Sequence, residues 1–254
     1  MFRLCRISSC ALLLFLAAGA AAFAQPQVAR WTIDGVERRA ILIPPTRPSG
    51  TKVPLVFAFH GAGDTAENFA LIDLHHAWPQ AMVVYMDGLS RGPNQGGAFQ
   101  TNDAGAGNRD LKFFDVALAD LRQRFPIDDA RIYATGFSNG AKFVYLLWAV
   151  RAKSLAAVAP VAGMLAPSLT LAEPKPMIHI GGREDHQNEF QLQVASIELA
   201  RRINGATGAG KACGPACLEY ASSKHAPVVT VLHDGGHVYP SNATELIVRF
   251  FQAH

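Results

Sequence analysis

The sequence predicts an α/β fold, in which a mostly parallel central sheet carries helices on both of its faces. Short continuous apolar runs recur along the chain, as they do in strands that are buried on both sides. Segments with the apolar spacing of amphipathic helices separate these runs, and such alternation builds parallel βαβ units with right-handed crossovers. Half of the residues are hydrophobic and 17% are charged, which is the composition of an ordinary globular chain.

The N-terminal segment has the pattern of a secretory signal peptide. A basic end precedes an apolar run over residues 11–22, and the small-residue exit Ala22-Phe-Ala24 follows. The alternative is a retained membrane anchor, but the apolar run is short for a membrane span. We expect residues 1–24 to be removed on export. No linker, repeat or low-complexity tract divides residues 25–254, so we expect them to form a single domain with no stable membrane anchor.

Removal of the signal peptide changes both the charge and the cysteine count. Loss of Arg3 and Arg6 lowers the formal net charge from +3 to +1, so nucleic acid is not an expected partner. Cys213 and Cys217 are then the remaining cysteines, and an isolated pair in an oxidising compartment normally forms a disulfide. A metal site is the alternative, but it would need two further ligands that the neighbouring residues do not offer.

The elements are expected in the following order. Residues 29–34 and 37–44 alternate in polarity and predict an N-terminal antiparallel hairpin, with its turn at Asp34-Gly35, at the edge of the sheet. Buried strands are predicted at the apolar runs 55–59, 81–86, 131–135, 155–162, 177–180 and 228–232. Helices are predicted at 110–125, 139–153, 188–203 and 241–252. Ligands of such sheets bind beyond the carboxyl ends of the strands, so the polar residues directly after the strands are the candidates for function.

Ser138 is the candidate nucleophile. The pattern Gly136-Phe-Ser-Asn-Gly140 lies between the predicted strand 131–135 and the predicted helix 139–153, which is the context that a G-x-S-x-G nucleophile elbow requires. A serine at the tip of so sharp a turn has a strained backbone, and the flanking glycines let strand and helix approach each other. An ordinary turn serine is the alternative, but the strand–turn–helix context favours catalysis.

A serine hydroxyl needs a base to take its proton, and His237 is the candidate. In hydrolases with this elbow the chain order is serine, acid, histidine, and His237 follows the last predicted strand on Asp234-Gly-Gly-His237. The acid that orients the imidazole is expected in Gly181-Gly-Arg-Glu-Asp185, directly after a strand. Asp185 and Glu184 are both competent, and their positions alone leave the choice open.

Other histidines fit the role of base less well. His179 lies inside an apolar strand, where a packed, hydrogen-bonded ring is expected. His225 precedes the last predicted strand, His233 lies at the end of that strand, and His254 is the terminal residue.

Donors for the developing oxyanion are expected from two backbone N–H groups. One belongs to Asn139, next to the nucleophile, and the other to Ala62 in the loop His60-Gly-Ala-Gly63. We expect His60 to hold this loop by a hydrogen bond rather than to act as a second base. His60, Phe137 and Tyr239 are also the candidate substrate contacts.

Two further aromatic residues, Trp78 and Phe99, are hypothesised to shape the acyl pocket. The stretch 91–108 is rich in Gly, Asn and Gln, and we expect it to be a surface loop near the cleft.

The chain resembles the polyhydroxybutyrate depolymerase and feruloyl esterase group of α/β-hydrolases over roughly residues 36–254. The motifs that carry the resemblance are His60-Gly-Ala-Gly63, Tyr85-Met-Asp-Gly88, Gly136-Phe-Ser-Asn-Gly140 and Gly235-Gly-His-Val-Tyr-Pro240. The resemblance implies an α/β-hydrolase fold in which Ser138 is the nucleophile, Asp185 the acid and His237 the base. It therefore favours Asp185 over Glu184.

The chain also departs from this group. Ala141 stands where a second glycine usually follows Ser-Asn-Gly, and Tyr239 stands where tryptophan is frequent. Gly182-Arg-Glu-Asp185 replaces the usual Gly-Thr-x-Asp, which keeps Glu184 open as the acid. The linker and surface-binding domain of larger polymer-degrading members are missing, which favours small or oligomeric esters over solid polymer.

These observations predict an exported serine esterase, either secreted or periplasmic. The expected substrates are hydroxyalkanoate oligomers, feruloyl esters or acetyl esters, hydrolysed through an acyl-enzyme intermediate without cofactor or metal. A peptidase or a thioesterase on the same fold is one alternative, and a non-catalytic hydrolase-like binding protein is another.

Overall fold

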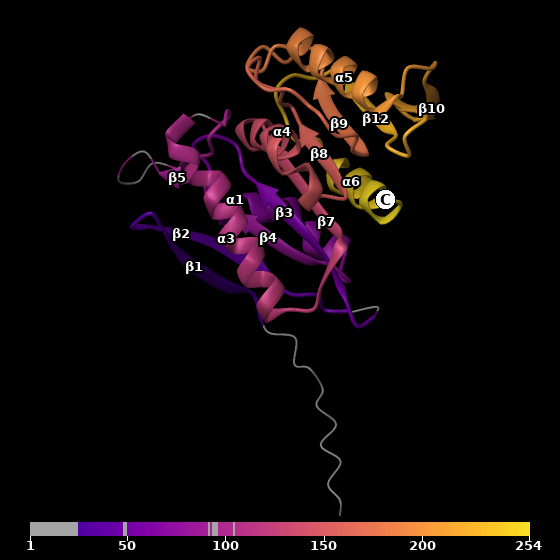
Figure 1. Ribbon diagram of the computed structural model, residues 1–254. Coiled ribbons are helices and arrows are strands. Elements are labelled where there is room, and N and C mark those ends of the chain that lie inside the picture. The colour runs from indigo at the N-terminus through magenta and orange to yellow at the C-terminus, as the bar shows by residue number, and fades with distance from the viewer. Residues whose placement is uncertain (1–24, 48–49, 91, 93–95, 104) are drawn as a thin grey trace, which may run out of the picture.

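The computed structural model describes residues 25–47, 50–90, 92, 96–103 and 105–254, and the predicted signal peptide lies outside these residues. It confirms the predicted α/β fold. A 10-stranded sheet crosses the molecule in the order β1-β2-β4-β3-β7-β8-β9-β12-β11-β10 (Figure 1). Strands β3, β4, β7, β8, β9 and β12 pair in parallel, and antiparallel pairs close both edges.

The bounds of the strands and helices are as follows. The sheet contains β1 (Gln27–Ile33), β2 (Val36–Ile43), β3 (Val53–Phe59), β4 (Met82–Met86), β7 (Ile127–Phe137), β8 (Ala157–Val161), β9 (Met177–Gly182), β10 (Lys211–Gly214), β11 (Cys217–Tyr220) and β12 (Val228–His233). A separate short pair is formed by β5 (Leu89–Ser90) and β6 (Gly97–Ala98). The helices are α1 (Ala66–Phe69), α2 (Leu74–Ala77), α3 (Arg109–Arg124), α4 (Asn139–Arg151), α5 (Phe190–Asn204) and α6 (Ala243–Gln252), with 3₁₀ turns η1 (Ala70–Ile72), η2 (Gly105–Asn108) and η3 (Ala152–Ser154).

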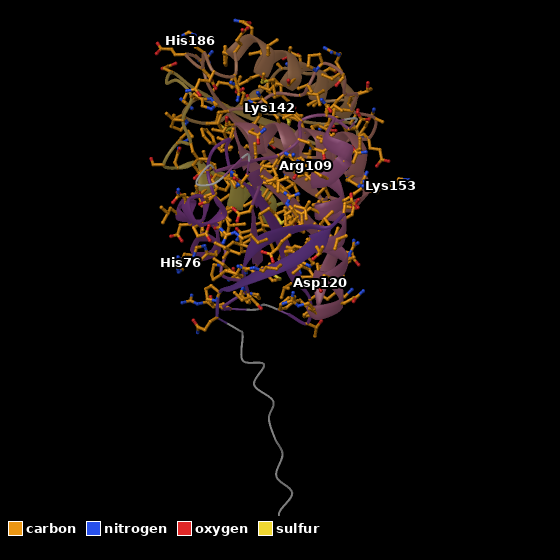
Figure 2. All side chains as sticks on the ribbon, turned by 90° about the vertical axis from the view of Figure 1, so that its left-hand side faces the viewer. His76, Arg109, Asp120, Lys142, Lys153 and His186 are labelled. Carbon is orange, nitrogen blue, oxygen red and sulfur yellow. A yellow bond between two sulfur atoms is a disulfide. The ribbon has the colours of Figure 1, made fainter. Side chains whose placement is uncertain are left out.

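Two apolar cores lie on the two faces of the sheet. Side chains of a strand alternate between faces, so the continuous apolar run of β3 supplies both cores. Phe57 and Phe59 contribute to the core that α3, α4 and α5 cover, whereas Val56 and Ala58 contribute to the core under α1, α2 and α6. Polar side chains such as His76 and His186 lie at the periphery (Figure 2).

Some elements were not predicted from the sequence. The segment α1–η1–α2 consists of single helical turns, of which the first is capped by the Thr65 hydroxyl accepting from the backbone N–H of Asn68 at 3.3 Å. The hairpin β10–β11 was missed because β10 is exposed throughout and has no apolar alternation. The predicted Cys213–Cys217 disulfide is confirmed, and it closes this hairpin.

None of the helices in the described part of the chain has the length and apolar character needed to cross a bilayer.

Candidate active site

Ser138 occupies a sharp turn between β7 and α4. Its φ is 55° and its ψ is −112°, a conformation that costs a non-glycine residue roughly 1–3 kcal/mol. A Cβ atom on Gly140 would lie 2.0 Å from the carbonyl oxygen of Phe59, so only glycine allows the helix to approach the sheet here. The Ser138 N–H donates to the carbonyl of Val161 at the end of β8, at 2.9 Å. The local structure is the elbow that the glycine spacing predicted.

The structure brings the three predicted side chains together. His237 Nε2 lies 2.8 Å from Ser138 Oγ, although the two residues are 99 positions apart in the chain. His237 Nδ1 lies 2.8 Å from Asp185 Oδ2. An ionised carboxylate only accepts hydrogen bonds, so Nδ1 donates to Asp185 and Nε2 is left to accept the serine proton.

Asp185 is 2% exposed, and all the hydrogen-bond partners of its carboxylate are donors. Oδ1 accepts from the backbone N–H groups of Gln187 and Asn188, both at 2.9 Å. Oδ2 accepts from Gln193 Nε2 at 2.9 Å as well as from His237. Burial raises the pKa of Asp185, but the hydrogen bonds from His237 and from the Asn188 backbone outweigh it, and the pKa lies below its usual value. The group is therefore an anion under ordinary conditions.

Glu184, the alternative acid, is exposed, and its carboxylate has no hydrogen bond or ion pair among the described residues. Its backbone N–H donates to the carbonyl of Gly235 at 3.1 Å, which ties the loop after β9 to the loop that carries His237. A Cβ atom on Gly182 would lie 2.2 Å from the same Gly235 oxygen, so the two loops can meet only because this residue is glycine. The geometry favours Asp185 as the acid.

The two expected oxyanion donors lie beside the nucleophile. Asn139 is the first residue of α4, and N–H groups in the first turn of a helix have no partner within the helix. Within the described part of the chain, the backbone N–H groups of Asn139 and Ala62 donate no hydrogen bond. A Cβ atom on Gly61, the residue before Ala62, would lie 3.6 Å from the Cβ of Ser138. The loop that carries Ala62 therefore passes next to the nucleophile at Gly61, and Asn139 follows the nucleophile in the chain.

The Asn139 side chain has a role that the sequence did not indicate. Its Oδ1 accepts from the backbone N–H of Phe99 at 2.7 Å, and its Nδ2 donates to the carbonyl of the same residue at 3.0 Å. This pair of hydrogen bonds fixes the segment after β6 against the elbow.

The expectation that His60 contacts substrate does not hold. The side chain is fully buried, and both ring nitrogens have partners: Nδ1 donates to the Gly61 carbonyl at 2.7 Å, and Nε2 accepts from the Gly88 N–H at 2.9 Å. Burial lowers its pKa, so the ring is neutral. His60 holds its loop in place, which is the structural role that the sequence also allowed.

The other aromatic candidates divide into two groups. Phe137 and Tyr239 are partly buried next to the imidazole, with ring centroids 4.9 Å apart for Phe137 and His237 and 6.2 Å apart for Phe137 and Tyr239. The hypothesis for Trp78 is wrong, whereas that for Phe99 stays a prediction. Trp78 packs against Tyr133 and borders a depression at the amino ends of β3 and β7, the opposite edge of the sheet. Phe99 is buried in the core beneath the site.

A buried chain of hydrogen bonds behind Asp185 was missed by the sequence analysis. Gln193 Nε2 donates to Asp185 and also to the carbonyl of Asn188 at 2.6 Å, while its Oε1 lies 3.1 Å from His179 Nε2. An amide oxygen only accepts, so His179 Nε2 donates and its Nδ1 accepts from the Tyr145 hydroxyl at 3.0 Å. Burial lowers the pKa of His179 to about 4, so the ring is neutral and the direction of the chain is fixed. The one signal in the sequence was a glutamine on the inner face of a predicted helix.

Asn188 is a second missed neighbour of the nucleophile. Its Nδ2 donates to the Ala162 carbonyl at 2.7 Å and lies 3.5 Å from Ser138 Oγ.

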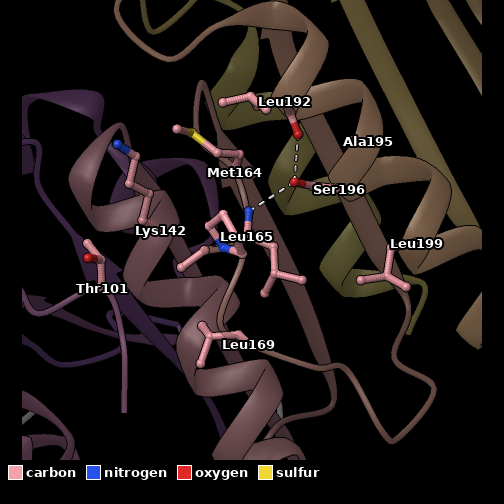
Figure 3. A pocket seen from close by; sticks show the side chains of 11 residues that line it. Thr101, Lys142, Met164, Leu165, Leu169, Leu192, Ala195, Ser196 and Leu199 are labelled. Carbon is pink, nitrogen blue, oxygen red and sulfur yellow. Dashed lines mark hydrogen bonds between the residues drawn. The ribbon is translucent and has the colours of Figure 1, made fainter. Parts of the chain in front are cut away.

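An apolar cavity of about 440 Å³ opens beside the elbow (Figure 3). It lies between α4, the segment after β8 and α5. The residues that line it are Thr101, Lys142, Met164, Leu165, Ala166, Pro167, Leu169, Leu192, Ala195, Ser196 and Leu199.

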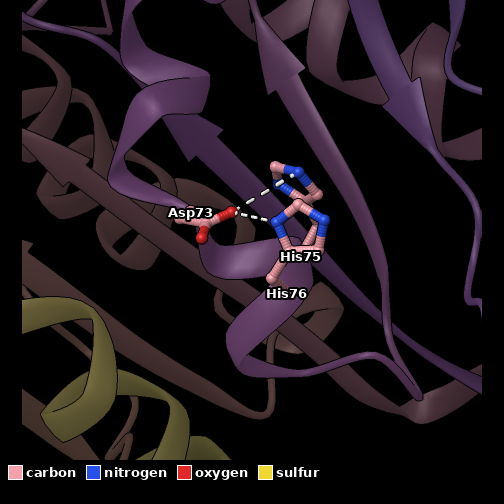
Figure 4. A group of neighbouring side chains, drawn as sticks. All are labelled: Asp73, His75 and His76. Carbon is pink, nitrogen blue, oxygen red and sulfur yellow. Dashed lines mark hydrogen bonds and ion pairs between the residues drawn. The ribbon is translucent and has the colours of Figure 1, made fainter.

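One group of side chains in the described ranges has the spacing of metal ligands. Asp73, His75 and His76 lie at and within α2, with their ligand atoms within 4.8 Å of one another (Figure 4). Asp73 and His76 are exposed, and His75 is partly buried.

The chain is similar in sequence to two proteins that are named as esterases. No protein-family model matches the chain. The chain is 27% identical over 238 residues to probable feruloyl esterase C from Aspergillus niger, covering 83% of this chain and 82% of that protein. It is 28% identical over 145 residues to a bifunctional acetylxylan esterase/xylanase from Neocallimastix patriciarum, covering 54% of this chain and 20% of that protein.

Solved structures share the fold at low sequence identity. The acetyl xylan esterase from Aspergillus awamori superposes with a TM-score of 0.69 at 12% identity, over 90% of this chain and 100% of that chain. The Bacillus cereus carboxylesterase superposes with a TM-score of 0.64 at 15% identity, over 85% of this chain and 94% of that chain. The chain is thus similar in sequence to a feruloyl esterase and an acetylxylan esterase, and it shares the α/β-hydrolase fold of solved esterases.

Proposed function

We propose that the protein is a serine hydrolase of carboxylic esters, with Ser138 as nucleophile, His237 as base and Asp185 as acid. The observation that carries the proposal is the pair of 2.8 Å contacts by which His237 bridges the serine hydroxyl and the buried carboxylate. The likeness to esterases supports hydrolysis of carboxylic esters in general.

Acylation begins with attack of Ser138 Oγ on the ester carbonyl carbon while His237 Nε2 takes the hydroxyl proton. The negative charge that develops on the carbonyl oxygen is held by the N–H groups of Ala62 and Asn139. Asp185 stabilises the imidazolium, which then gives its proton to the departing alcohol. The product of this step is an acyl ester on Ser138.

Deacylation repeats the sequence with water. His237 takes a proton from the water molecule as its oxygen attacks the acyl carbon, and the same two N–H groups hold the oxyanion. Collapse of the intermediate returns the proton to Ser138 Oγ and releases the carboxylic acid. Every proton in the two steps passes through His237 Nε2, and the residues need no metal or cofactor to complete them.

The substrate classes that we propose are hydroxyalkanoate oligomers, feruloyl esters and acetyl esters. A screen of 4-nitrophenyl butyrate, hydroxybutyrate oligomer, methyl ferulate and acetylated xylan, with a peptide amide and a thioester beside them, separates an esterase from a peptidase or a thioesterase. Turnover of the amide or the thioester alone contradicts the proposal.

The matched variant is Ser138→Ala, which is expected to lower kcat by roughly 10⁴–10⁶-fold in a triad enzyme. A non-catalytic binding protein would hydrolyse none of these substrates, and the variant would be as inert as the parent. Retention of esterase activity by a folded Ser138→Ala protein excludes the proposed nucleophile.

We also propose that the protein is exported, on the signal-peptide pattern of residues 1–24 and the Cys213–Cys217 disulfide. Mass spectrometry of the protein from its natural host is expected to find a mature chain that starts near Gln25. A chain that retains its first residues contradicts export by cleavage.

A further inference from the structure

Two segments that line the apolar cavity lie against the backbone carbonyl of Ser138. On α4, the Lys142 N–H donates to the Ser138 carbonyl at 3.1 Å. On the segment after β8, a Cβ atom on Gly163 would lie 2.9 Å from the same carbonyl, and Met164 follows directly. Lys142 and Met164 both line the cavity, so a substrate chain that leaves the scissile ester in this direction enters it.

Most of the cavity wall is hydrocarbon. Met164, Leu165, Leu169 and Leu192 supply much of it, so the wall favours an aliphatic chain. The Ser196 hydroxyl is not free for a ligand, because it accepts from the Leu165 N–H at 3.0 Å and donates to the Leu192 carbonyl at 2.8 Å (Figure 3).

Lys142 is the one charged residue among those that line this cavity. It is partly buried, and within the described part of the chain its ammonium has no ion pair or hydrogen bond. Burial lowers its pKa and the negative charge of Asp185 raises it, but Asp185 is already engaged by its four hydrogen-bond donors. A partly desolvated cation without a partner is costly, and an anionic ligand offsets that cost.

The Lys142 side chain is also expected to extend toward the end of α4 where Ser138 lies. Side chains of a helix tilt toward its N-terminus, and Ser138 stands at the N-terminus of α4. In Figure 3 the Lys142 ammonium lies at the same end of the cavity as Met164. The cation therefore stands at the end of the apolar cavity that is nearest to the nucleophile.

We propose that this cavity is a subsite for the acidic end of the substrate: it takes an aliphatic chain that ends in a carboxylate, and Lys142 binds that carboxylate. The proposal rests on the proposed esterase function and narrows it. Half-esters of aliphatic dicarboxylic acids carry such a free carboxylate at the far end of the acyl chain. Feruloyl and acetyl esters of sugars carry none, and a hydroxyalkanoate oligomer carries it on the alcohol side of the ester. The preferred class is therefore the half-esters of aliphatic dicarboxylic acids.

The test compares two substrates that differ only in charge. One is the mono-4-nitrophenyl ester of adipic acid, which keeps a free carboxylate, and the other is the corresponding neutral primary amide. The measured quantity is the ratio of their kcat/KM values. We expect a ratio of about ten or more for the wild-type protein, because a hydrogen bond to a charged group in a partly buried site has that effect. Lys142→Met should lower the ratio by about tenfold, and Lys142→Arg should retain most of it.

Lys153→Met is the matched control. Lys153 is an exposed lysine on η3, apart from Lys142 (Figure 2), so its replacement removes the same charge from the protein but not from the cavity. The ratio of kcat/KM values should not change in this variant. Circular dichroism of all three variants verifies that they are folded.

A wild-type ratio near one, or an unchanged ratio in Lys142→Met, overturns the subsite. An equal fall in Lys153→Met also overturns it, because the preference would then come from net charge.

A binding experiment separates this proposal from the esterase proposal. Hexanoate and hexanamide are titrated calorimetrically into the Ser138→Ala protein, which requires no turnover. We expect hexanoate to bind about tenfold more tightly, and the difference to disappear when Lys142→Met is added. Equal affinities for both probes contradict the subsite even if esters are hydrolysed. Tighter hexanoate binding by a protein that hydrolyses no ester supports the subsite and rejects the esterase.

Discussion

Replacement of Asp185 by asparagine is expected to remove most of the activity while leaving the fold intact. Oδ1 of Asp185 accepts two backbone hydrogen bonds, so the carbonyl oxygen of an asparagine would take this place. Its NH₂ group would then face His237 Nδ1 and Gln193 Nε2, which are both donors in the native protein. The imidazole relieves this conflict by moving its proton to Nε2.

A proton on Nε2 points at Ser138 Oγ, 2.8 Å away, and the ring can no longer accept the serine proton. The same tautomer error in a serine triad costs about 10⁴-fold in kcat. That loss corresponds to about 5 kcal/mol of activation free energy. We expect this magnitude for Asp185→Asn.

The assay is hydrolysis of 4-nitrophenyl butyrate, with the unfolding midpoint measured in parallel. Glu184→Gln is the matched control: it also neutralises a carboxylate of the same loop, but the side chain is exposed and unpaired in the described part of the chain. Its kcat should stay within about twofold of the parent. A folded Asp185→Asn protein with nearly full activity, or a large loss in Glu184→Gln, refutes the assignment of the acid.

Three further results are expected. Gln193→Leu removes a hydrogen-bond donor to Asp185 Oδ2 and leaves the His179 Nε2 proton without its acceptor. The value of kcat should therefore fall by about tenfold with little change in KM. An unchanged kcat would show that Gln193 does not position the acid. The pKa of His179 is about 4 in the fold against about 6.5 in an unfolded chain, so the unfolded state binds more protons between these values. The free energy of unfolding, measured in urea, should therefore be highest above about pH 6.5 and fall by about 3 kcal/mol toward pH 4. The lowered pKa of His60 changes the stability in the same direction. A free energy of unfolding that does not change with pH contradicts a buried neutral ring at His179. Reduction of the Cys213–Cys217 disulfide should lower the free energy of unfolding by about 2 kcal/mol. It should leave kcat unchanged, because the small loop that the disulfide closes lies at the edge of the sheet, away from Ser138. Loss of activity in folded, reduced protein would contradict this expectation.

The fold could be predicted because strand burial and helix amphipathicity are local properties of the sequence. The run Val53–Phe59 is apolar at every position because both faces of this strand are covered. Glycines at 136 and 140 are required because a larger side chain would clash with the backbone at this turn, so their spacing predicts the turn. The approach of His237 to Ser138 also followed from chain order, because the carboxyl ends of parallel strands lie along one edge of the sheet.

What the sequence left open depends on side-chain direction and on contacts between distant segments. The choice of Asp185 over Glu184 is decided by the path of the loop after Gly182, which turns one carboxylate inward and leaves its neighbour in solvent. The contact between Gln193 and His179 joins a helix to a strand, and no local pattern marks it. The burial of His60 likewise depends on the neighbouring β4–β5 connection.

Covalent labelling tests the central claim most directly. A fluorophosphonate reacts with a serine only where a base activates the hydroxyl and donors stabilise the developing negative charge. After incubation with this reagent, intact-mass and peptide analysis should find a single adduct on Ser138, formed in proportion to the loss of ester hydrolysis. An active protein that forms no adduct, or an adduct at another residue that accompanies the loss of activity, would contradict the account.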